Sequence, residues 1–436
     1  MGRDLACVVL AAGRGSRMRS ARPKVLHPLA GRPLLAWVLE ALEALAPARI
    51  VVVAGPGGED VAAAAHPYAV ATQPVQDGTG GALAAALPSL AGFDGQVLVV
   101  MGDVPLVEPA CLHALLDAAG EGAAVLAADL PDPAGYGRVI VNTNGDVERI
   151  VEEREANAAQ RAVRLVNAGA WVLPSQGLGR WLSALTPDNA AGERYLTDLP
   201  GHMAQDGVAT RPCVVGDPMA LRGVNTRADL AALEALVQGR LREKAMAGGV
   251  TLADPGTTYL SWDTALAPDV TVGPCVAFGP GVRVDEGAEI RAFSHLEGAT
   301  VETGAVVGPF ARLRPGTRVG AGARVGNFVE IKAATLGAGV KAGHLAYIGD
   351  AILGPCVNFS AGAVVANYDG RTKHKTTIGQ GAMVGTNAVL VAPVEIGAGA
   401  FVAAGSVITK AVPAGALAVA RGRQEVKPGR APPREP

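Results

Sequence analysis

The sequence predicts two different folds in one chain: an α/β domain followed by a parallel β-helix of hexapeptide repeats. In the first half, short apolar runs alternate with segments of helical spacing, which is typical of a mostly parallel sheet covered by helices. In the second half, an Ile, Val, Leu or Phe recurs every six residues and is often followed by Gly. A period of six fits neither a helix nor simple strand alternation, and it indicates short strands stacked as coils.

The hexapeptide ladder can be followed along the chain, with slips of register and one insertion. Its apolar positions are Val272, Phe278, Val284, Ile290 and Leu296, then Val301, Val307, Leu313, Val319, Val325 and Ile331, then Ile348, then Leu353, Phe359 and Val365, and finally Ile378, Val384, Leu390, Ile396, Val402 and Ile408. Stacked coils bury these side chains as one core, and Gly supplies the dihedral angles of the corners. We interpret residues 326–375 as a region where the ladder breaks and where loops leave the coil to build a site.

The first half opens with an apolar strand and a Gly-rich turn. The strand is predicted over residues 5–11, the turn over 13–17, a helix over 34–46, and further strands over 50–54, 97–101 and 123–127. Open α/β sheets bind ligands at the carboxyl ends of their strands. We therefore expect a site where the Gly-rich turn leaves the first strand.

A single amphipathic helix is predicted between the two halves. It covers residues 226–246, and Thr226 suits its N-cap because a hydroxyl can accept a hydrogen bond from the first turn. The division that follows is a domain over 1–225, a linker helix over 226–248, and a β-helix domain with a Pro- and Arg-rich tail over 249–436. Two or more domains are also expected from the length of 436 residues.

Composition excludes several classes of protein. The net charge of -2 gives no electrostatic case for binding nucleic acid. No apolar run reaches about 20 residues, so no membrane insertion is expected, and the first residues do not form a signal peptide. The five cysteines are scattered without paired spacing, which argues against a zinc site or a disulfide framework and favours a cytoplasmic location.

The Gly-rich turn belongs to the longer string LAAGRGSRMRSARPKVLHPLAGRPLL. Backbone N–H groups of such a turn can bind phosphates, and Arg17 and Lys24 can neutralise the charge of a triphosphate. The turn lacks both the third Gly of a dinucleotide fingerprint and the Gly-Lys-Ser/Thr of a Walker loop. A structural turn with two solvated cations is the alternative from spacing alone. The full string resembles the sugar-1-phosphate nucleotidyltransferases, whose signature is a Gly-rich turn, an Arg and a Pro-Lys pair.

That resemblance implies a site assembled from several segments. Residues 76–80, QDGTG, resemble the uridine-contacting segment of the family, and Asp103 with Asn225 match its Mg²⁺ ligands, which are oxygen donors as this metal prefers. Lys24 is implied as catalytic, and the residues implied to bind UTP or the sugar phosphate are Leu10, Ala11, Gly13, Arg17, Gln76, Gly78, Thr79, Gly137, Glu152, Asn167 and Asn225. The chain departs from the family at Met101, where an aromatic residue is usual.

Together, the two halves resemble the bifunctional family of N-acetylglucosamine-1-phosphate uridyltransferases and glucosamine-1-phosphate N-acetyltransferases. The resemblance implies a left-handed β-helix that assembles as a homotrimer with acetyl-transfer sites between subunits. It also implies that the chain acetylates glucosamine 1-phosphate with acetyl-CoA. The product, N-acetylglucosamine 1-phosphate, is then joined to UTP with release of pyrophosphate, to supply bacterial peptidoglycan and lipopolysaccharide synthesis.

The acetyl-transfer site is expected around the inserted loop NYDGRTKHK. An amine must lose a proton as it attacks a thioester, and the imidazole of His344 suits a general base, with Glu330 expected to orient its ring. The resemblance implies that Arg314, Lys332, Tyr347, Asn358, Asn367 and Tyr368 contact the sugar phosphate, and that Thr386, Ala404 and Arg421 contact acetyl-CoA.

Two alternatives stay open at this point. One is a nucleotidyltransferase with a single reaction, whose β-helix serves assembly or regulation. The other is a non-catalytic β-helix scaffold that carries a sugar-nucleotide-binding domain. Saturable binding of acetyl-CoA with release of a thiol separates both from the bifunctional hypothesis.

Overall fold

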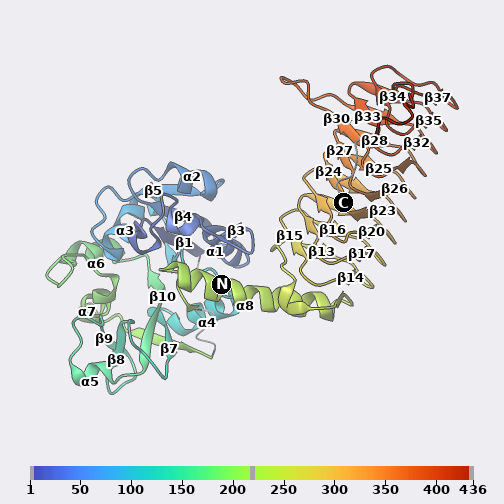
Figure 1. The fold of residues 1–436 in the computed structure, drawn as a ribbon. Coiled ribbons are helices and arrows are strands. Elements are labelled where there is room, and N and C mark those ends of the chain that lie inside the picture. Colours follow the sequence, from blue (N-terminus) through green and yellow to red (C-terminus); the bar gives the residue numbers. More distant parts are fainter. Residues whose placement is uncertain (1–3, 217–220, 432–436) are drawn as a thin grey trace. The chain divides into compact units, whose positions relative to one another are not determined.

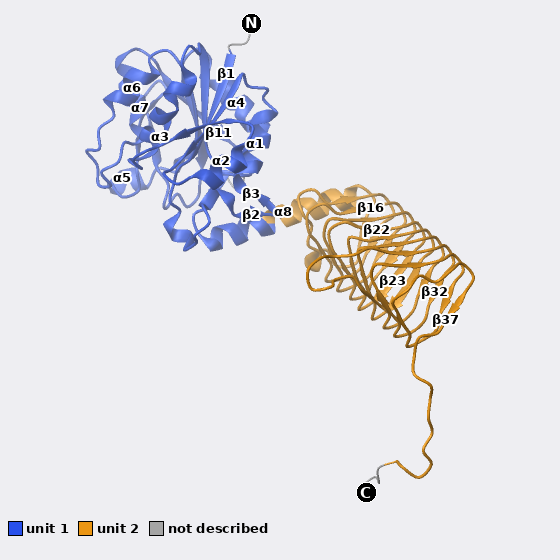
Figure 2. Ribbon diagram, turned by 90° about the horizontal axis from the view of Figure 1, so that it is seen from above, with its two compact units in different colours: residues 1–235 blue, residues 236–436 orange. Residues whose placement is uncertain are grey.

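The computed structural model describes residues 4–216 and 221–431. The chain divides into two compact units, residues 1–235 and 236–436 (Figure 2). Unit 1 has the α/β fold and unit 2 is a stack of coils, a left-handed β-helix of hexapeptide repeats (Figure 1). Both predicted fold classes are therefore confirmed. The division falls within helix α8 (Arg227–Ala247), which contributes residues to each unit.

The sheet of unit 1 is mostly parallel, as predicted. Its main strands are β1 (Asp4–Ala11), β4 (Arg49–Ala54), β5 (Ala69–Thr72), β6 (Gly95–Met101), β7 (Ala123–Asp129), β10 (Leu165–Pro174) and β11 (Thr210–Val215), in the order β11-β7-β10-β6-β1-β4-β5. Strand β10 runs antiparallel to β6 and β7, and the other pairs along this path are parallel. Strands β8 (Arg138–Val141) and β9 (Val147–Val151) extend the sheet as an antiparallel pair.

Helices pack on this sheet, and both of its faces are buried. The helices are α1 (Leu34–Glu43), α2 (Glu59–Ala65), α3 (Thr79–Ala86), α4 (Pro109–Ala119), α5 (Ala158–Arg161), α6 (Leu178–Ala184) and α7 (Leu199–Gln205). Successive residues of β1 enter opposite cores, Val9 one and Val8 the other. Because both faces are covered, these strands are continuous apolar runs, which is why the sequence predicts them. Helix α1 ends at Glu43 rather than at residue 46, since Ala46 adopts a left-handed conformation (φ 48°).

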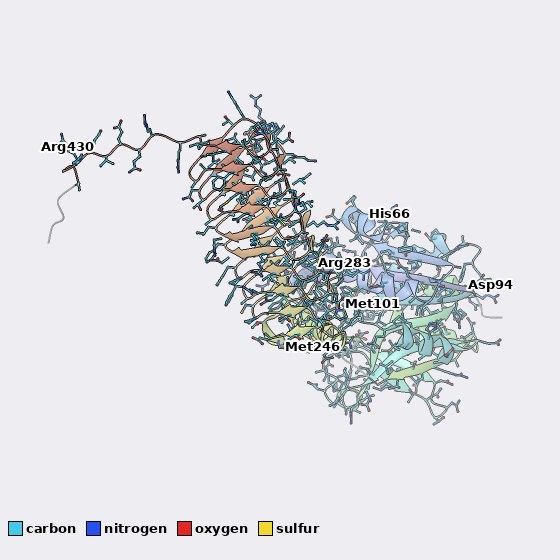
Figure 3. The ribbon with its side chains drawn as sticks, turned by 90° about the vertical axis from the view of Figure 1, so that its right-hand side faces the viewer. His66, Asp94, Met101, Met246, Arg283 and Arg430 are labelled. Carbon is cyan, nitrogen blue, oxygen red and sulfur yellow. The ribbon has the colours of Figure 1, made fainter. Side chains whose placement is uncertain are left out.

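The β-helix of unit 2 runs from β12 (Thr251–Leu252) to β37 (Leu417–Ala418). Each coil adds one short strand to each of three parallel sheets. Every predicted ladder residue is at most 5% exposed, so the six-residue period is the core of this unit. Alternate residues point outward: Arg283, labelled in Figure 3, is exposed on β16 (Arg283–Val284), whereas Val284 is 1% exposed.

The predicted break in the ladder over residues 326–375 is wrong for most of that stretch. Leu336 and Ala342 are 1% and 0% exposed and fill the two positions between Ile331 and Ile348. The strands continue from β24 (Glu330–Lys332) to β30 (Val364–Ala366), and only residues 367–375 leave the coil. A pattern of large apolar residues at a spacing of six misses Ala342, which is small, and Leu336, which comes one residue early.

Helix α8 begins as predicted. The Thr226 Oγ1 accepts a hydrogen bond from the Asp229 N–H at 3.1 Å, and Asp229 Oδ2 accepts one from the Thr226 N–H at 2.8 Å. This reciprocal pair is a capping box with Asp in place of Glu. Further along, Gln238 bonds both backbone groups of Leu260, which fixes the end of α8 to the first coil. Over residues 4–216 and 221–431, no helix is both long and apolar enough to cross a membrane.

Candidate functional site

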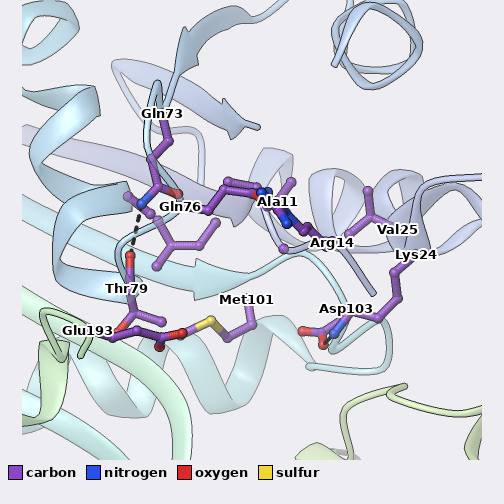
Figure 4. A pocket seen from close by; sticks show the side chains of 15 residues that line it. Ala11, Arg14, Lys24, Val25, Gln73, Gln76, Thr79, Met101, Asp103 and Glu193 are labelled. Atoms are coloured by element: carbon purple, nitrogen blue, oxygen red, sulfur yellow. Dashed lines mark hydrogen bonds and ion pairs between the residues drawn. The ribbon is translucent and has the colours of Figure 1, made fainter. Parts of the chain in front are cut away.

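A cavity of about 550 Å³ opens in unit 1 at the carboxyl ends of β1 and β6 (Figure 4). It is lined by the turn after β1, by the segment after β5 and by the end of β6: Leu10, Ala11, Ala12, Gly13, Arg14, Lys24, Val25, Gln73, Gln76, Gly78, Thr79, Ala82, Met101, Asp103 and Glu193. This is the edge where parallel strands place ligand sites, as the sequence predicts.

Lys24 lies between two oxygen-bearing side chains at this edge. It starts the short helix η2 (Lys24–Leu26), and its Nζ forms an ion pair with Asp103 and donates to Asn225 Oδ1 at 3.2 Å. Arg17 Nη2 donates to the same amide oxygen at 2.9 Å. The side chains of Lys24 and Asp103 are 14% and 17% exposed. Carboxylate and amide oxygens thus converge on one cation, a donor set that fits Mg²⁺.

The Gly-rich turn owes its shape to Gly15. This residue has φ 59°, and a Cβ there would lie 2.7 Å from the Cβ of Lys24. Only glycine combines this conformation with such close packing. The turn can therefore close over Lys24 and present its backbone N–H groups to the cavity.

The segment after β5 carries one residue that the sequence analysis missed. Gln73 is 3% exposed, lines the cavity, and donates to the Gly78 carbonyl at 3.1 Å. It directly follows strand β5, which the sequence analysis did not predict, so recognition of that strand is the signal that could have identified it. The predicted residue Gln76 links this segment to the Gly-rich turn, since it bonds the Ala12 carbonyl and Arg14.

A second cavity of about 370 Å³ shares Asp103 with the first. It is lined by Asp103, Val104, Gly135, Tyr136, Asn167, Ala168, Gly169, Leu221, Arg222, Gly223, Asn225 and Asp229. The predicted residues Gly137 and Glu152 line neither cavity but lie together: a Cβ on Gly137 would be 3.3 Å from Glu152 Oε1. Burial raises the pKa of the Glu152 carboxyl, and Thr197 donates to it at 3.4 Å.

In unit 2, charged groups gather on the sheet that contains β21 (Arg312–Leu313), β24 and β27 (Tyr347–Gly349). Glu330, directly above Tyr347 in register, accepts a hydrogen bond from Arg314 Nη1 at 2.9 Å. Lys332 Nζ lies 3.9 Å from Asp350 Oδ2, and Asp350 also accepts a hydrogen bond from Asn367. These residues lie on successive coils, which is why Arg314, Lys332 and Asp350 are each 18 residues apart in the sequence.

The loop of residues 367–375 adds a lysine that the sequence analysis did not select. Lys373 lies beside Lys332, and this neighbouring ammonium lowers the pKa of Lys373. Asp369 holds the loop, since it accepts from the Arg371 and Thr372 N–H groups at 2.8 Å each and contacts His374, and these bonds lower the pKa of Asp369. Two adjacent ammonium groups are suited to bind an anion such as a phosphate.

His344 has a different partner from the one expected. It ends β26 (Lys341–His344), and its Nδ1 lies 2.6 Å from Asn327 Oδ1 on β23 (Arg324–Asn327), one coil away. Glu330 belongs to the next sheet around the coil and bonds Arg314 instead. Because an amide oxygen only accepts, this contact fits the tautomer in which Nδ1 carries the proton and Nε2 can accept one.

The three residues expected at acetyl-CoA lie together at the far end of the β-helix. The Thr386 carbonyl accepts from the Gly405 N–H at 2.8 Å, and Arg421 Nη1 donates to the Ala404 carbonyl at 2.8 Å. Asn358 lies on β29 (Asn358–Phe359), in the sheet of His344, while Tyr368 is 60% exposed on the loop. Among the residues that the structure describes, no hydrogen bond or ion pair joins His344 to the group around Lys332.

Comparison with known proteins gives matches to both halves. The MobA-like NTP transferase domain family matches residues 7–141, and the bacterial transferase hexapeptide family (six repeats) matches residues 375–410. The bifunctional protein GlmU of Sphingopyxis alaskensis is 50% identical over 437 residues, which covers 98% of this chain and 96% of that protein. The bifunctional protein GlmU of Rhodospirillum rubrum is 51% identical over 430 residues, covering 97% and 96% respectively.

Proposed function

We propose, because this chain belongs to the family of bifunctional GlmU proteins, that its two units hold separate active sites for two consecutive reactions. As a member of that family, the chain is both a nucleotidyltransferase and an N-acetyltransferase of UDP-N-acetylglucosamine synthesis. The observation that carries the division is the presence of two Lys–Asp–Asn clusters: Lys24 with Asp103 and Asn225, and Lys332 with Asp350 and Asn367.

The cavity at the ends of β1 and β6 takes UTP. Residues 76–79 contact the base, and the Gly-rich turn with Arg17 and Lys24 binds the phosphates. Asp103 and Asn225 hold Mg²⁺, which when bound neutralises charge on the reacting phosphates. The second cavity, which shares Asp103, takes N-acetylglucosamine 1-phosphate.

Uridylyl transfer needs no covalent intermediate. An oxygen of the sugar phosphate attacks the α-phosphorus of UTP in line, and the bond to the pyrophosphate breaks as the new P–O bond forms. Lys24 offsets the negative charge that accumulates on the phosphates. Because Lys24 bonds both Asp103 and Asn225 in this structure, it must move toward the phosphates when substrate and metal enter.

Acetyl transfer takes place on the β-helix. His344 Nε2 accepts a proton from the amine of glucosamine 1-phosphate as the nitrogen attacks the thioester carbon. The C–S bond then breaks, and the imidazolium returns that proton to the sulfur, which leaves as the thiol of CoA. Asn327 holds the ring in the required tautomer. Arg314, Lys332 and Lys373 bind the sugar phosphate, and Thr386, Ala404 and Arg421 bind acetyl-CoA.

The protein works as a homotrimer in the cytoplasm. The hexapeptide repeats are compatible with a trimer, and the lack of a bond between His344 and the Lys332 group in the described residues suits a site completed by a second copy. None of the five cysteines, all of which lie in the described residues, forms a disulfide bond, and burial raises the pKa of the Cys7 thiol to about 12, so this thiol is inert. Cysteines without disulfide bonds suit a reducing compartment.

The test is one assay with glucosamine 1-phosphate, acetyl-CoA, UTP and Mg²⁺, in which free thiol and pyrophosphate are followed together. The proposal predicts that thiol appears first and pyrophosphate follows. Release of pyrophosphate only when N-acetylglucosamine 1-phosphate is supplied, with no thiol at any time, would leave the β-helix without its reaction and contradict the proposal.

A further inference from the structure

Two charged residues stand directly behind the wall of the UTP cavity. Asp77 and Arg194 do not line it, but their chain neighbours Gln76, Gly78 and Glu193 do. Arg194 Nε donates to Asp77 Oδ2 at 2.8 Å, and Arg194 Nη2 bonds the same oxygen. The two side chains are 33% and 27% exposed, so the ion pair is partly shielded from water.

Backbone contacts reinforce this ion pair. The Arg194 N–H donates to the Asp77 carbonyl at 2.6 Å, and the Arg194 carbonyl accepts from the Gly80 N–H at 2.9 Å. Two residues further, the Leu196 N–H donates to Thr79 Oγ1 at 3.0 Å. The segment 187–195 is therefore fastened along residues 77–80.

Gly78 permits this close approach. It has φ 105°, and a Cβ at this position would lie 2.5 Å from the Arg194 carbonyl oxygen. No side chain can separate the two segments here, so any movement of residues 187–195 changes the surface that Gly78 presents to the cavity. Glu193, on the same segment, moves with it.

Asp77 joins a third element to the pair. Its Oδ1 accepts from Gln73 Nε2 at 3.0 Å while its Oδ2 binds Arg194. Burial alone would raise the pKa of Asp77, but the hydrogen bonds from Arg194 and Gln73 bring it below its usual value, so the carboxylate is charged at neutral pH. The Asp77 carboxylate thus fixes the position of the end of β5 relative to the segment 187–195.

We propose that Asp77 and Arg194 are positioning residues of uridylyl transfer, which fix the wall formed by Gln76, Gly78, Thr79 and Glu193 at the width that the base of UTP requires. The inference rests on the proposed function of this cavity. A flat base is held by close contacts on its edges and faces, and a displacement of about 1 Å can cost substantial activity. The second cavity has no lining residue in either segment, so binding of the sugar phosphate is not affected.

The test compares Arg194→Gln, Asp77→Asn and Arg194→Lys by steady-state kinetics. We expect KM for UTP to rise about fivefold in the first two variants, the upper end for a partly exposed ion pair, and less in Arg194→Lys. KM for N-acetylglucosamine 1-phosphate and the rate of acetyl transfer stay unchanged. In the double variant Arg194→Gln with Asp77→Asn, KM for UTP is expected to rise only as much as in either single variant, because the two residues act as a pair.

Arg180→Gln is the matched control, since it removes an Arg–Asp ion pair with Asp206 in the same unit, away from the UTP cavity. Its KM for UTP is expected to equal that of the unmodified protein. An unchanged KM for UTP in Arg194→Gln and Asp77→Asn, with only a lower melting temperature, would overturn the positioning role. Absence of UTP-dependent pyrophosphate release from the unmodified protein would instead overturn the proposed function itself.

Discussion

The two units solve one problem, holding a sugar phosphate against a reacting group, with similar residues in different arrangements. In unit 1, Lys24 bonds Asp103 and Asn225, and both partners offer oxygens to a single point. In unit 2, Asn367 bonds Asp350 through its amide nitrogen, and Lys332 lies 3.9 Å from that carboxylate with Lys373 beside it. The first cluster is built to accept a divalent cation, and the second supplies its positive charge from lysines.

The difference follows from the chemistry of the two reactions. In the proposed uridylyl transfer, negative charge develops on the phosphate oxygens and the leaving pyrophosphate, and a divalent cation held by Asp103 and Asn225 would offset that charge. Acetyl transfer leaves the phosphate of the sugar unchanged, so this phosphate is only an anchor and lysines suffice. The reacting group there is the amine, which needs a base, and His344 is the residue that we propose for that role.

Asp103→Asn tests the metal cluster and has the largest expected effect. Loss of the carboxylate lowers the rate of uridylyl transfer by roughly 10³-fold, since stabilisation by the metal is worth several kcal/mol. Acetyl transfer by the same variant stays normal, as measured by thiol release. Addition of EDTA to the unmodified protein is likewise expected to stop uridylyl transfer and to leave acetyl transfer normal. Loss of both reactions on addition of the chelator would contradict the claim that only the first cluster binds a metal ion.

His344→Ala reverses that pattern. Removal of the general base lowers the rate of acetyl transfer by about 10²-fold or more, while pyrophosphate release from UTP and N-acetylglucosamine 1-phosphate is unchanged. His295→Ala, which changes an exposed histidine on β18 (His295–Leu296), serves as the control. Full acetyl transfer in His344→Ala would show that another group removes the proton.

Lys373→Gln sharpens the second half of the comparison. Loss of one charged hydrogen bond to the sugar phosphate raises KM for glucosamine 1-phosphate by about tenfold, with little change in kcat. Because Lys332 lowers the pKa of Lys373, Lys373 loses its charge at a lower pH than an ordinary lysine. KM therefore rises as pH increases through that lowered pKa. In Lys332→Gln, KM rises at a higher pH, because the ammonium group that lowers the pKa of Lys373 is absent. A pH profile of KM that matched the unmodified protein would contradict the effect of Lys332 on Lys373.

Glu330→Gln has the smallest expected effect. Glu330 pairs with Arg314, and a partly exposed ion pair of this kind changes KM for glucosamine 1-phosphate by only about threefold. The dependence of kcat on pH is unchanged, because the partner of His344 is Asn327. Asn327→Ala is the comparison variant and is expected to lower kcat for acetyl transfer by about tenfold, part of the general-base contribution. A larger decrease in kcat in Glu330→Gln than in Asn327→Ala would instead indicate that Glu330 orients His344.

The sequence predicts the repeating parts of this molecule better than its long-range contacts. Val284 and Ile290 can be assigned to a core because the period of six repeats over many coils, whereas Ala342 is hidden by its small size. Strand β1 and the turn after it are likewise evident, but Gln73 and Arg194 are not, since they act through partners in other segments. The pairing of His344 with Asn327 depends on the length of one coil, which a local pattern does not give.

The central claim, two independent sites on one chain, is tested most directly by mixing two inactive variants. Asp103→Asn alone and His344→Ala alone should each fail to release pyrophosphate at a normal rate from glucosamine 1-phosphate, acetyl-CoA and UTP with Mg²⁺. Mixed as separately purified proteins, they should restore it after a lag, because N-acetylglucosamine 1-phosphate made by the first diffuses to the second. If the mixture stayed as inactive as either variant while both remained folded, the two reactions would not be separable in this way and the account would be wrong.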